Sequence, residues 1–216
     1  MQKNEVLARM HEIGLVPVLR ASSTQEALAI ARAIEAGGVP VLEVTMTVPG
    51  AVRVIEELVE HGSRALLVGA GTVLDAETAR ACILAGAQFI VSPALDLRTI
   101  ETCRKYGVPV LPGALTPTEI ITAWQAGADV VKVFPCSAVG GAKYLKAIKA
   151  PLPQIELLPT GGVSLATAAE FLGAGAFALG VGSDLVDNKA IADGHPETIT
   201  ENARQYLAIT QQARKH

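Results

Sequence analysis

The chain has 216 residues, half of them hydrophobic and only 18% charged, so it can build a buried core and is not a disordered protein. A formal charge of −3 and an aromatic content of 4% argue against a nucleic-acid partner. No apolar run approaches the roughly 18 residues of a membrane helix, the start has no secretory signal pattern, and three cysteines without CxxC spacing argue against disulfides or zinc. We therefore expect a cytoplasmic protein without a membrane partner.

Short apolar segments recur along the chain and are typical of buried parallel strands. There are eight of them, at residues 16–20, 41–46, 66–73, 89–93, 109–115, 130–135, 156–162 and 177–183. Amphipathic patterns between them predict helices at 24–36, 51–60, 76–85, 97–105, 117–125, 142–150 and 165–172, with further helices at 4–12 and 196–213.

This alternation predicts an α/β fold, a single-domain (β/α)8 TIM barrel over residues 1–216 with an extra N-terminal helix. An open doubly wound sheet is the alternative, but no GxGxxG turn follows the first strand. In a barrel, the functional residues lie at the C-terminal ends of the strands.

Lys132 is the most informative residue, because it is the one charged side chain within the apolar run 130–135. Strand alternation places it on one face with Val130 and Phe134. A buried ammonium is costly, so it either pairs with a carboxylate or lowers its pKa and becomes a neutral nucleophile suited to a Schiff base. The alternative is a lysine whose stem packs while its head reaches water.

Glu43 is a second charged residue in an apolar strand, and it belongs to the same predicted barrel mouth. Burial raises a carboxyl pKa into the range useful for proton transfer, whereas a nearby ammonium lowers it. Glu43 is therefore interpreted as a general acid/base, or else as a structural ion-pair partner of Lys132.

Glycine-rich turns follow the last two strands, at residues 160–164 and 180–183. Barrels often bind phosphate on the backbone N–H groups at this place, although glycine there can also serve the turns alone. The four histidines fall outside the strand ends, and neither a Ser-His-Asp arrangement nor a nicotinamide fingerprint is present. We expect neither a metal nor an organic cofactor.

These motifs together resemble the Schiff-base aldolases that cleave 2-keto-3-deoxy-6-phosphogluconate (KDPG) and 4-hydroxy-2-oxoglutarate (KHG). The matching segments are Glu43-Val44-Thr45, Gly69-Ala70-Gly71-Thr72, Val91-Ser92-Pro93, Pro112-Gly113 with Thr116-Pro117-Thr118-Glu119, Val131-Lys132-Val133-Phe134-Pro135, Pro159-Thr160-Gly161-Gly162-Val163 and Gly180-Val181-Gly182-Ser183. They span the second to the eighth strand in the family's order.

The resemblance implies that the protein cleaves KDPG to pyruvate and glyceraldehyde 3-phosphate, with 4-hydroxy-2-oxoglutarate as a second candidate substrate. It also implies a homotrimer. Lys132 would form the imine and Glu43 would transfer protons. The substrate-binding residues that it implies are Thr72 and Pro93 at the pyruvyl end, Phe134 beside the imine, and Thr160, Gly161, Gly162 and Ser183, of which the last three would hold the phosphate.

One position departs from the family pattern, because many members carry an arginine two residues after the Glu-Val-Thr motif and this chain has Thr47. Arg20, at the end of the first strand, is our candidate for the missing carboxylate contact, with an ion pair to Glu43 as its competing role. Arg20 and Thr47 are further candidate substrate-binding residues. Three other functions stay open: an aldolase for the galactonate epimer, a phosphosugar isomerase or epimerase, and a non-catalytic scaffold.

Overall fold

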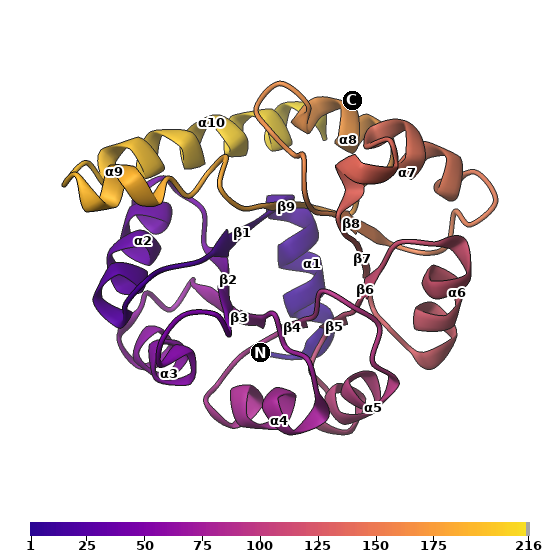
Figure 1. Cartoon of the computed structure of the whole chain (residues 1–216), viewed down its shortest axis with the longest axis horizontal. Coiled ribbons are helices and arrows are strands. Elements are labelled where there is room, and N and C mark those ends of the chain that lie inside the picture. The colour runs from indigo at the N-terminus through magenta and orange to yellow at the C-terminus, as the bar shows by residue number, and fades with distance from the viewer. Residues whose placement is uncertain (215–216) are drawn as a thin grey trace.

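The computed structural model describes residues 1–214 and forms a ring of parallel strands surrounded by helices (Figure 1). The strands are β1 (Leu15–Leu19), β2 (Val41–Thr45), β3 (Leu67–Gly71), β4 (Ile90–Val91), β5 (Val110–Leu111), β6 (Gly113–Ala114), β7 (Val131–Val133), β8 (Leu157–Pro159) and β9 (Leu179–Val181). The helices are α1 (Lys3–Ile13), α2 (Thr24–Ala36), α3 (Ala51–His61), α4 (Ala76–Leu84), α5 (Leu97–Tyr106), α6 (Pro117–Ala126), α7 (Ala142–Lys149), α8 (Ala168–Gly173), α9 (Asn188–Ala192) and α10 (Glu197–Ala213), with one 3-10 turn at Cys136–Val139.

The ring is assembled from two hydrogen-bonded sheets, ordered β5-β4-β3-β2-β1-β9 and β6-β7-β8. A parallel bridge between Thr160 and Gly180 joins the end of β8 to β9. On the other side, β5 and β6 are consecutive pieces of one chain segment, separated only by Pro112. The predicted (β/α)8 barrel is confirmed.

The expected strand at 109–115 is therefore wrong in one respect, since it forms two pieces. Proline has no N–H and cannot donate to a ladder, although the carbonyl of Pro112 still accepts a hydrogen bond from the Lys132 amide at 2.9 Å. The strands are also shorter than the apolar segments predicted. The short helix α9, capped by Asp187 through the amides of Lys189 and Ala190, was not expected.

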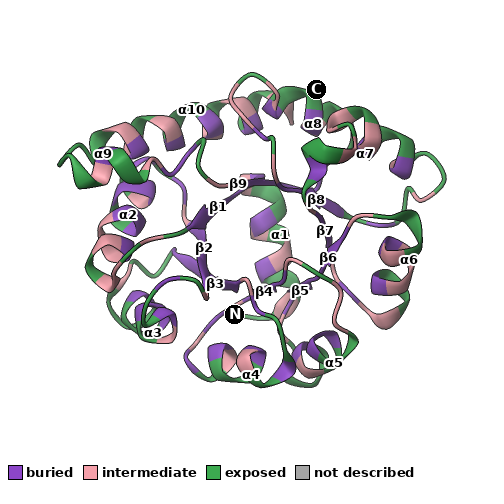
Figure 2. Ribbon diagram, viewed as in Figure 1, coloured by how far each residue is buried: buried purple, intermediate pink, exposed green. Residues whose placement is uncertain are grey.

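Two separate apolar cores follow from strand alternation, and Figure 2 shows the strands as the most continuously buried part of the molecule. Outward-facing side chains such as Leu42 and Val44 pack against the surrounding helices. Inward-facing side chains such as Val41 and Phe89 pack against Val6 and Met10 of α1, which is seen through the ring in Figure 1. The extra N-terminal helix thus closes the bottom of the barrel.

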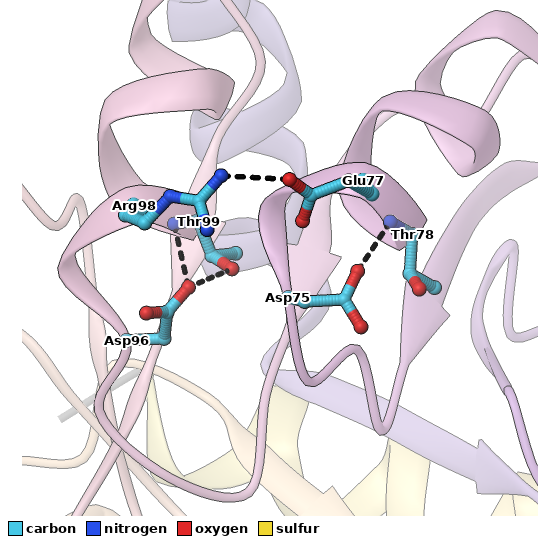
Figure 3. A network of polar contacts seen from close by, with 6 residues as sticks. All are labelled: Asp75, Glu77, Thr78, Asp96, Arg98 and Thr99. Carbon is cyan, nitrogen blue, oxygen red and sulfur yellow. Dashed lines mark hydrogen bonds and ion pairs between the residues drawn. The ribbon is translucent and has the colours of Figure 1, made fainter.

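Two capped helices fix the loops that leave β3 and β4 (Figure 3). The carboxylate of Asp75 accepts a hydrogen bond from the Thr78 amide at 2.6 Å and begins α4. Asp96 accepts from the amide and the hydroxyl of Thr99 at 2.8 and 2.6 Å and begins α5. An ion pair of 2.7 Å between Arg98 and Glu77 connects the two helices at their starts.

None of the helices within residues 1–214 combines the length and the apolar character needed to cross a membrane.

Candidate active site

Lys132 and Glu43 meet inside the C-terminal half of the barrel. Register pairs Lys132 of β7 with Gly113 and Leu158, and it pairs Glu43 of β2 with Val18 and Gly69. Lys132 is only 4% exposed and Glu43 is completely buried. The Lys132 Nζ atom lies 3.7 Å from Glu43 Oε1 and 5.3 Å from the centre of the Phe134 ring. The lysine head is therefore not in water.

The carboxylate of Glu43 is buried without hydrogen-bond donors. Within the described part of the chain neither of its oxygens has a hydrogen-bond partner, because the contact with Lys132 is longer than a hydrogen bond. Buried polar atoms are nearly always satisfied, so this carboxylate is ready to accept a bond from a bound hydroxyl or water. Its position depends on Gly71: a Cβ atom there would lie 1.8 Å from Oε1.

A pocket at the barrel mouth lies next to this pair, formed by the turns after β8 and β9. Its lining includes Phe134, Thr160, Gly161, Gly162 and Ser183. Gly161 and Gly162 have φ angles of +89° and +78°, a left-handed conformation that favours glycine. The hydroxyl of Thr160 is buried and has no hydrogen-bond partner among residues 1–214.

Arg20 is exposed and lines the same pocket as Ser183. Its Nη1 atom lies 3.3 Å from the place a Cβ atom would take at Gly182. In residues 1–214, Glu43 is paired with Lys132 and has no ion pair with Arg20, so the competing role expected for Arg20 is not observed. The guanidinium therefore belongs to the glycine-rich side of the mouth.

The remaining predicted residues also stand at strand ends around the mouth. Thr72 follows β3 and has a φ of 55°, unusual for a residue with a side chain. Pro93 follows β4, and its carbonyl group lies 2.3 Å from the position of a Cβ atom at Gly113. Thr47 follows β2, is exposed, and its hydroxyl lies 2.7 Å from that of Thr45.

A model of the family described as KDPG and KHG aldolase matches residues 6–202. The chain belongs to this aldolase family. It is 34% identical over 204 residues to the 2-dehydro-3-deoxy-phosphogluconate aldolase of Treponema pallidum (strain Nichols), covering 94% of this chain and 97% of that protein. It is 38% identical over 175 residues to the 2-dehydro-3-deoxy-6-phosphogalactonate aldolase of Escherichia coli (strain K12), covering 81% and 85%.

A solved structure agrees with this assignment. The KDPG aldolase of Legionella pneumophila, captured with pyruvate as a covalent carbinolamine, superimposes with a TM-score of 0.85 at 32% identity and covers 94% of this chain and 97% of that one. A carbinolamine is the adduct of an amine and a carbonyl, the step before an imine. This aldolase is therefore a lyase, and the family uses Schiff-base chemistry.

Two residues at the mouth of this aldolase had no role in our sequence analysis. Thr45 is fully buried, and its hydroxyl donates to the Leu19 carbonyl at 2.9 Å. Asp184 is exposed and lines the pocket next to Ser183. Strand alternation from Glu43 does put Thr45 on the inner face, but no pattern in the sequence shows that its partner is a carbonyl of β1.

Clusters of three or more histidine, cysteine, aspartate or glutamate side chains able to hold a metal ion are not found in residues 1–214.

Proposed function

We propose that this aldolase cleaves KDPG to pyruvate and glyceraldehyde 3-phosphate through an imine on Lys132. The observation that carries the proposal is the buried pair of Lys132 and Glu43, in which the carboxylate lacks hydrogen-bond donors among the described residues. A structural ion pair would instead be expected to satisfy its oxygens. Phe134, whose ring centre lies 5.3 Å from Lys132 Nζ, also lines the glycine-rich pocket at the mouth.

The chemistry follows from these two groups. The amine of Lys132 adds to the C2 carbonyl to give a carbinolamine. Protonated Glu43 gives its proton to the carbinolamine hydroxyl, which leaves as water, and the resulting iminium acts as an electron sink. Glu43 takes the proton of the C4 hydroxyl while the C3–C4 bond breaks, which releases the aldehyde and leaves an enamine. Glu43 then returns the proton to C3, and hydrolysis of the imine releases pyruvate and restores the amine.

The remaining mouth residues bind the ends of the substrate in this proposal. The phosphate lies against the amides of Gly161 and Gly162, the hydroxyl of Ser183 and the guanidinium of Arg20, because these donors converge on one pocket. Thr160 offers its free hydroxyl to the substrate chain, and Phe134 forms the wall beside the imine. Thr72 and Pro93 line the pyruvyl end, and backbone donors near Thr72 take the carboxylate, since Arg20 is assigned to the phosphate.

Borohydride reduction in the presence of pyruvate tests the mechanism. An imine becomes a permanent adduct, and peptide mapping by mass spectrometry should place it on Lys132. The enzyme without pyruvate and the Lys132→Ala variant serve as controls. An isomerase or epimerase that only stabilises an enolate would give no adduct, and a label on any other lysine would end the assignment.

The galactonate epimer is the second candidate substrate, because the relative named for it is 38% identical to this chain. The two epimers differ only at C4, next to the bond that breaks. The ratio of kcat/KM for KDPG, its galactonate epimer and 4-hydroxy-2-oxoglutarate, measured with one preparation, decides among the three. The last substrate carries no phosphate and also reports what the glycine-rich pocket contributes.

We also propose a homotrimer that acts in the cytoplasm. Leu74 and Leu97 are 63% and 51% exposed beside the starts of α4 and α5, an arrangement that favours burial by a second copy. All three cysteines are free thiols, which suits a reducing compartment. Sedimentation analysis of the purified chain and of a Leu74→Glu, Leu97→Glu variant tests the assembly, since the variant should sediment as a smaller species.

A further inference from the structure

Two threonine hydroxyls form a short hydrogen-bonded chain between the mouths of β2 and β1. The Oγ1 atoms of Thr47 and Thr45 are 2.7 Å apart, and Thr45 Oγ1 lies 2.9 Å from the Leu19 carbonyl oxygen. Regular pairing of the two strands ends at Leu19 and Val44. The side chain of Thr45 therefore extends the connection beyond the last paired residues.

The direction of these bonds can be assigned. A hydroxyl has one proton, and a carbonyl oxygen only accepts. Thr45 therefore donates to Leu19, and Thr47 must donate to Thr45. The single proton of Thr47 is used inside the protein, so Thr47 does not donate to a substrate carboxylate while the chain is intact.

Leu19 is the residue directly before Arg20, so this chain of hydroxyls fixes the backbone from which the arginine extends. Arg20 is exposed, and the path of its long side chain depends on where that backbone is held. Its guanidinium reaches Gly182 and the pocket shared with Ser183. We infer that Thr45 and Thr47 are positioning residues that hold Arg20 for the anionic group of the substrate, an inference that rests on the proposed function.

The test is a double-mutant cycle between Thr45 and Arg20. Thr45→Val keeps the shape of the side chain and removes the hydroxyl. It should raise KM for the phosphorylated substrate by about tenfold, which corresponds to the free energy of one hydrogen bond, and it should change kcat much less. In the Arg20→Ala background the same substitution should change KM by less than about twofold. Thr45→Ser retains the hydroxyl and should restore KM.

Thr210 provides a control, because it is also fully buried and its hydroxyl lies 2.9 Å from the carbonyl oxygens of both Ile13 and Leu207, at the opposite end of the barrel. Thr210→Val should lower the urea midpoint and leave KM unchanged. Equal KM factors for Thr45→Val with and without Arg20, or a Thr45→Ser enzyme as poor as Thr45→Val, would make Thr45 a merely structural residue and overturn the inference.

Two additions keep the test decisive. If Thr45→Val does not fold, the exposed Thr47→Val takes its place in the same cycle. The affinity for inorganic phosphate, measured by calorimetry on the same variants, reports the coupling without catalysis. If the Thr45 and Arg20 substitutions have non-additive effects on the phosphate affinity but the enzyme forms no pyruvate adduct, the positioning role is supported and the proposed function is refuted. If their effects are additive and the enzyme does form the adduct, only the positioning role is refuted.

Discussion

Glu43 and Thr45 lie two residues apart on the inner face of β2, and their hydrogen bonding is opposite. Both oxygens of Glu43 lack donors among the described residues, whereas the Thr45 hydroxyl has both an acceptor and a donor. Proteins rarely leave a buried carboxylate in this state unless a ligand completes it. The contrast separates the residue that we propose for proton transfer from the one that we propose holds the mouth in place.

Glu43→Gln should reduce kcat by about 10²–10⁴ while the fold stays intact, because the amide has the same shape and can neither take nor return a proton. Steady-state turnover, together with borohydride trapping of pyruvate, measures the loss at each step. Near wild-type turnover would make Glu43 a structural partner of Lys132.

Gly71→Ala should reduce turnover to a similar extent, because the new methyl group would collide with the carboxylate of Glu43, 1.8 Å from its Oε1 atom. The backbone of Gly71 is not left-handed, so the substitution acts through this collision and not through strain. Gly173→Ala is the matched control, since a Cβ atom at Gly173 meets nothing within 4 Å. Equal kcat values for the two variants would show that Glu43 moves aside without cost.

At the residue scale, the sequence predicts the positions of some side chains well and those of others not at all. A single charge within an apolar strand is visible in the sequence, so Lys132 and Glu43 could be proposed as a pair, and the structure places them 3.7 Å apart. The destination of a flexible side chain is not visible. Arg20 was expected to contact the substrate carboxylate, which stays a prediction, or to pair with Glu43, which is paired with Lys132 instead. Its guanidinium lies against Gly182, because a long side chain follows local packing that no periodicity encodes.

At the scale of elements, the start of α5 depends on one carboxylate. Asp96→Ala should lower the free energy of unfolding by about 1–2 kcal/mol, because it removes the acceptor for the Thr99 amide and also leaves the buried Thr99 hydroxyl without its partner. Arg98→Ala, next to it, breaks only the exposed ion pair with Glu77 and should cost less than about 0.5 kcal/mol. Urea unfolding of both variants measures the difference. A larger loss in Arg98→Ala would reverse this ranking.

Element order was predictable because strands and helices have different periods and because Asp, Ser and Thr caps mark helix starts. Element length was less predictable. The apolar segment 89–93 contains a strand of only two residues, Ile90–Val91. The Ser92 amide still donates to the Leu111 carbonyl at 3.2 Å, but Pro93 has no N–H to continue the ladder. Apolar character reports burial, and residues just beyond a strand are equally buried here.

At the scale of the whole molecule, burial raises the pKa of all three cysteine thiols. Desolvation raises the pKa of Cys82 and of Cys136 to about 11 and that of Cys103 to about 12, compared with 9.0 for a free thiol. Below pH 9 the thiols are protonated in both states. Between pH 9 and 11 the unfolded chain loses thiol protons that the folded chain keeps, so the stability should fall as pH rises.

Urea midpoints at pH 8 and pH 10.5 check this, with a triple Cys→Ala variant as the control for lysine and tyrosine titration. The wild-type chain should lose more stability than the variant over this interval, and a thiol reagent at pH 8 should react only after unfolding. Rapid labelling of the native protein would contradict the burial.

The closure of the ring is not marked in the sequence. The bridge between Thr160 and Gly180 and the contact of α1 with the barrel interior join residues that are far apart in the chain.

Since α1 closes the bottom of the barrel, molecules enter and leave through one opening, and the depth of each fragment then matches the order in which the proposed chemistry frees it. Lys132 is level with Leu158 on β8, and Gly161 lies three residues further out, about 10 Å along the strand. In the proposed function, the keto acid on Lys132 would consequently lie beneath the phosphorylated fragment, which would depart first because the keto acid is still bound to the lysine. Product inhibition should show this sequence: pyruvate, the last to leave, should compete with substrate, and the aldehyde should inhibit noncompetitively.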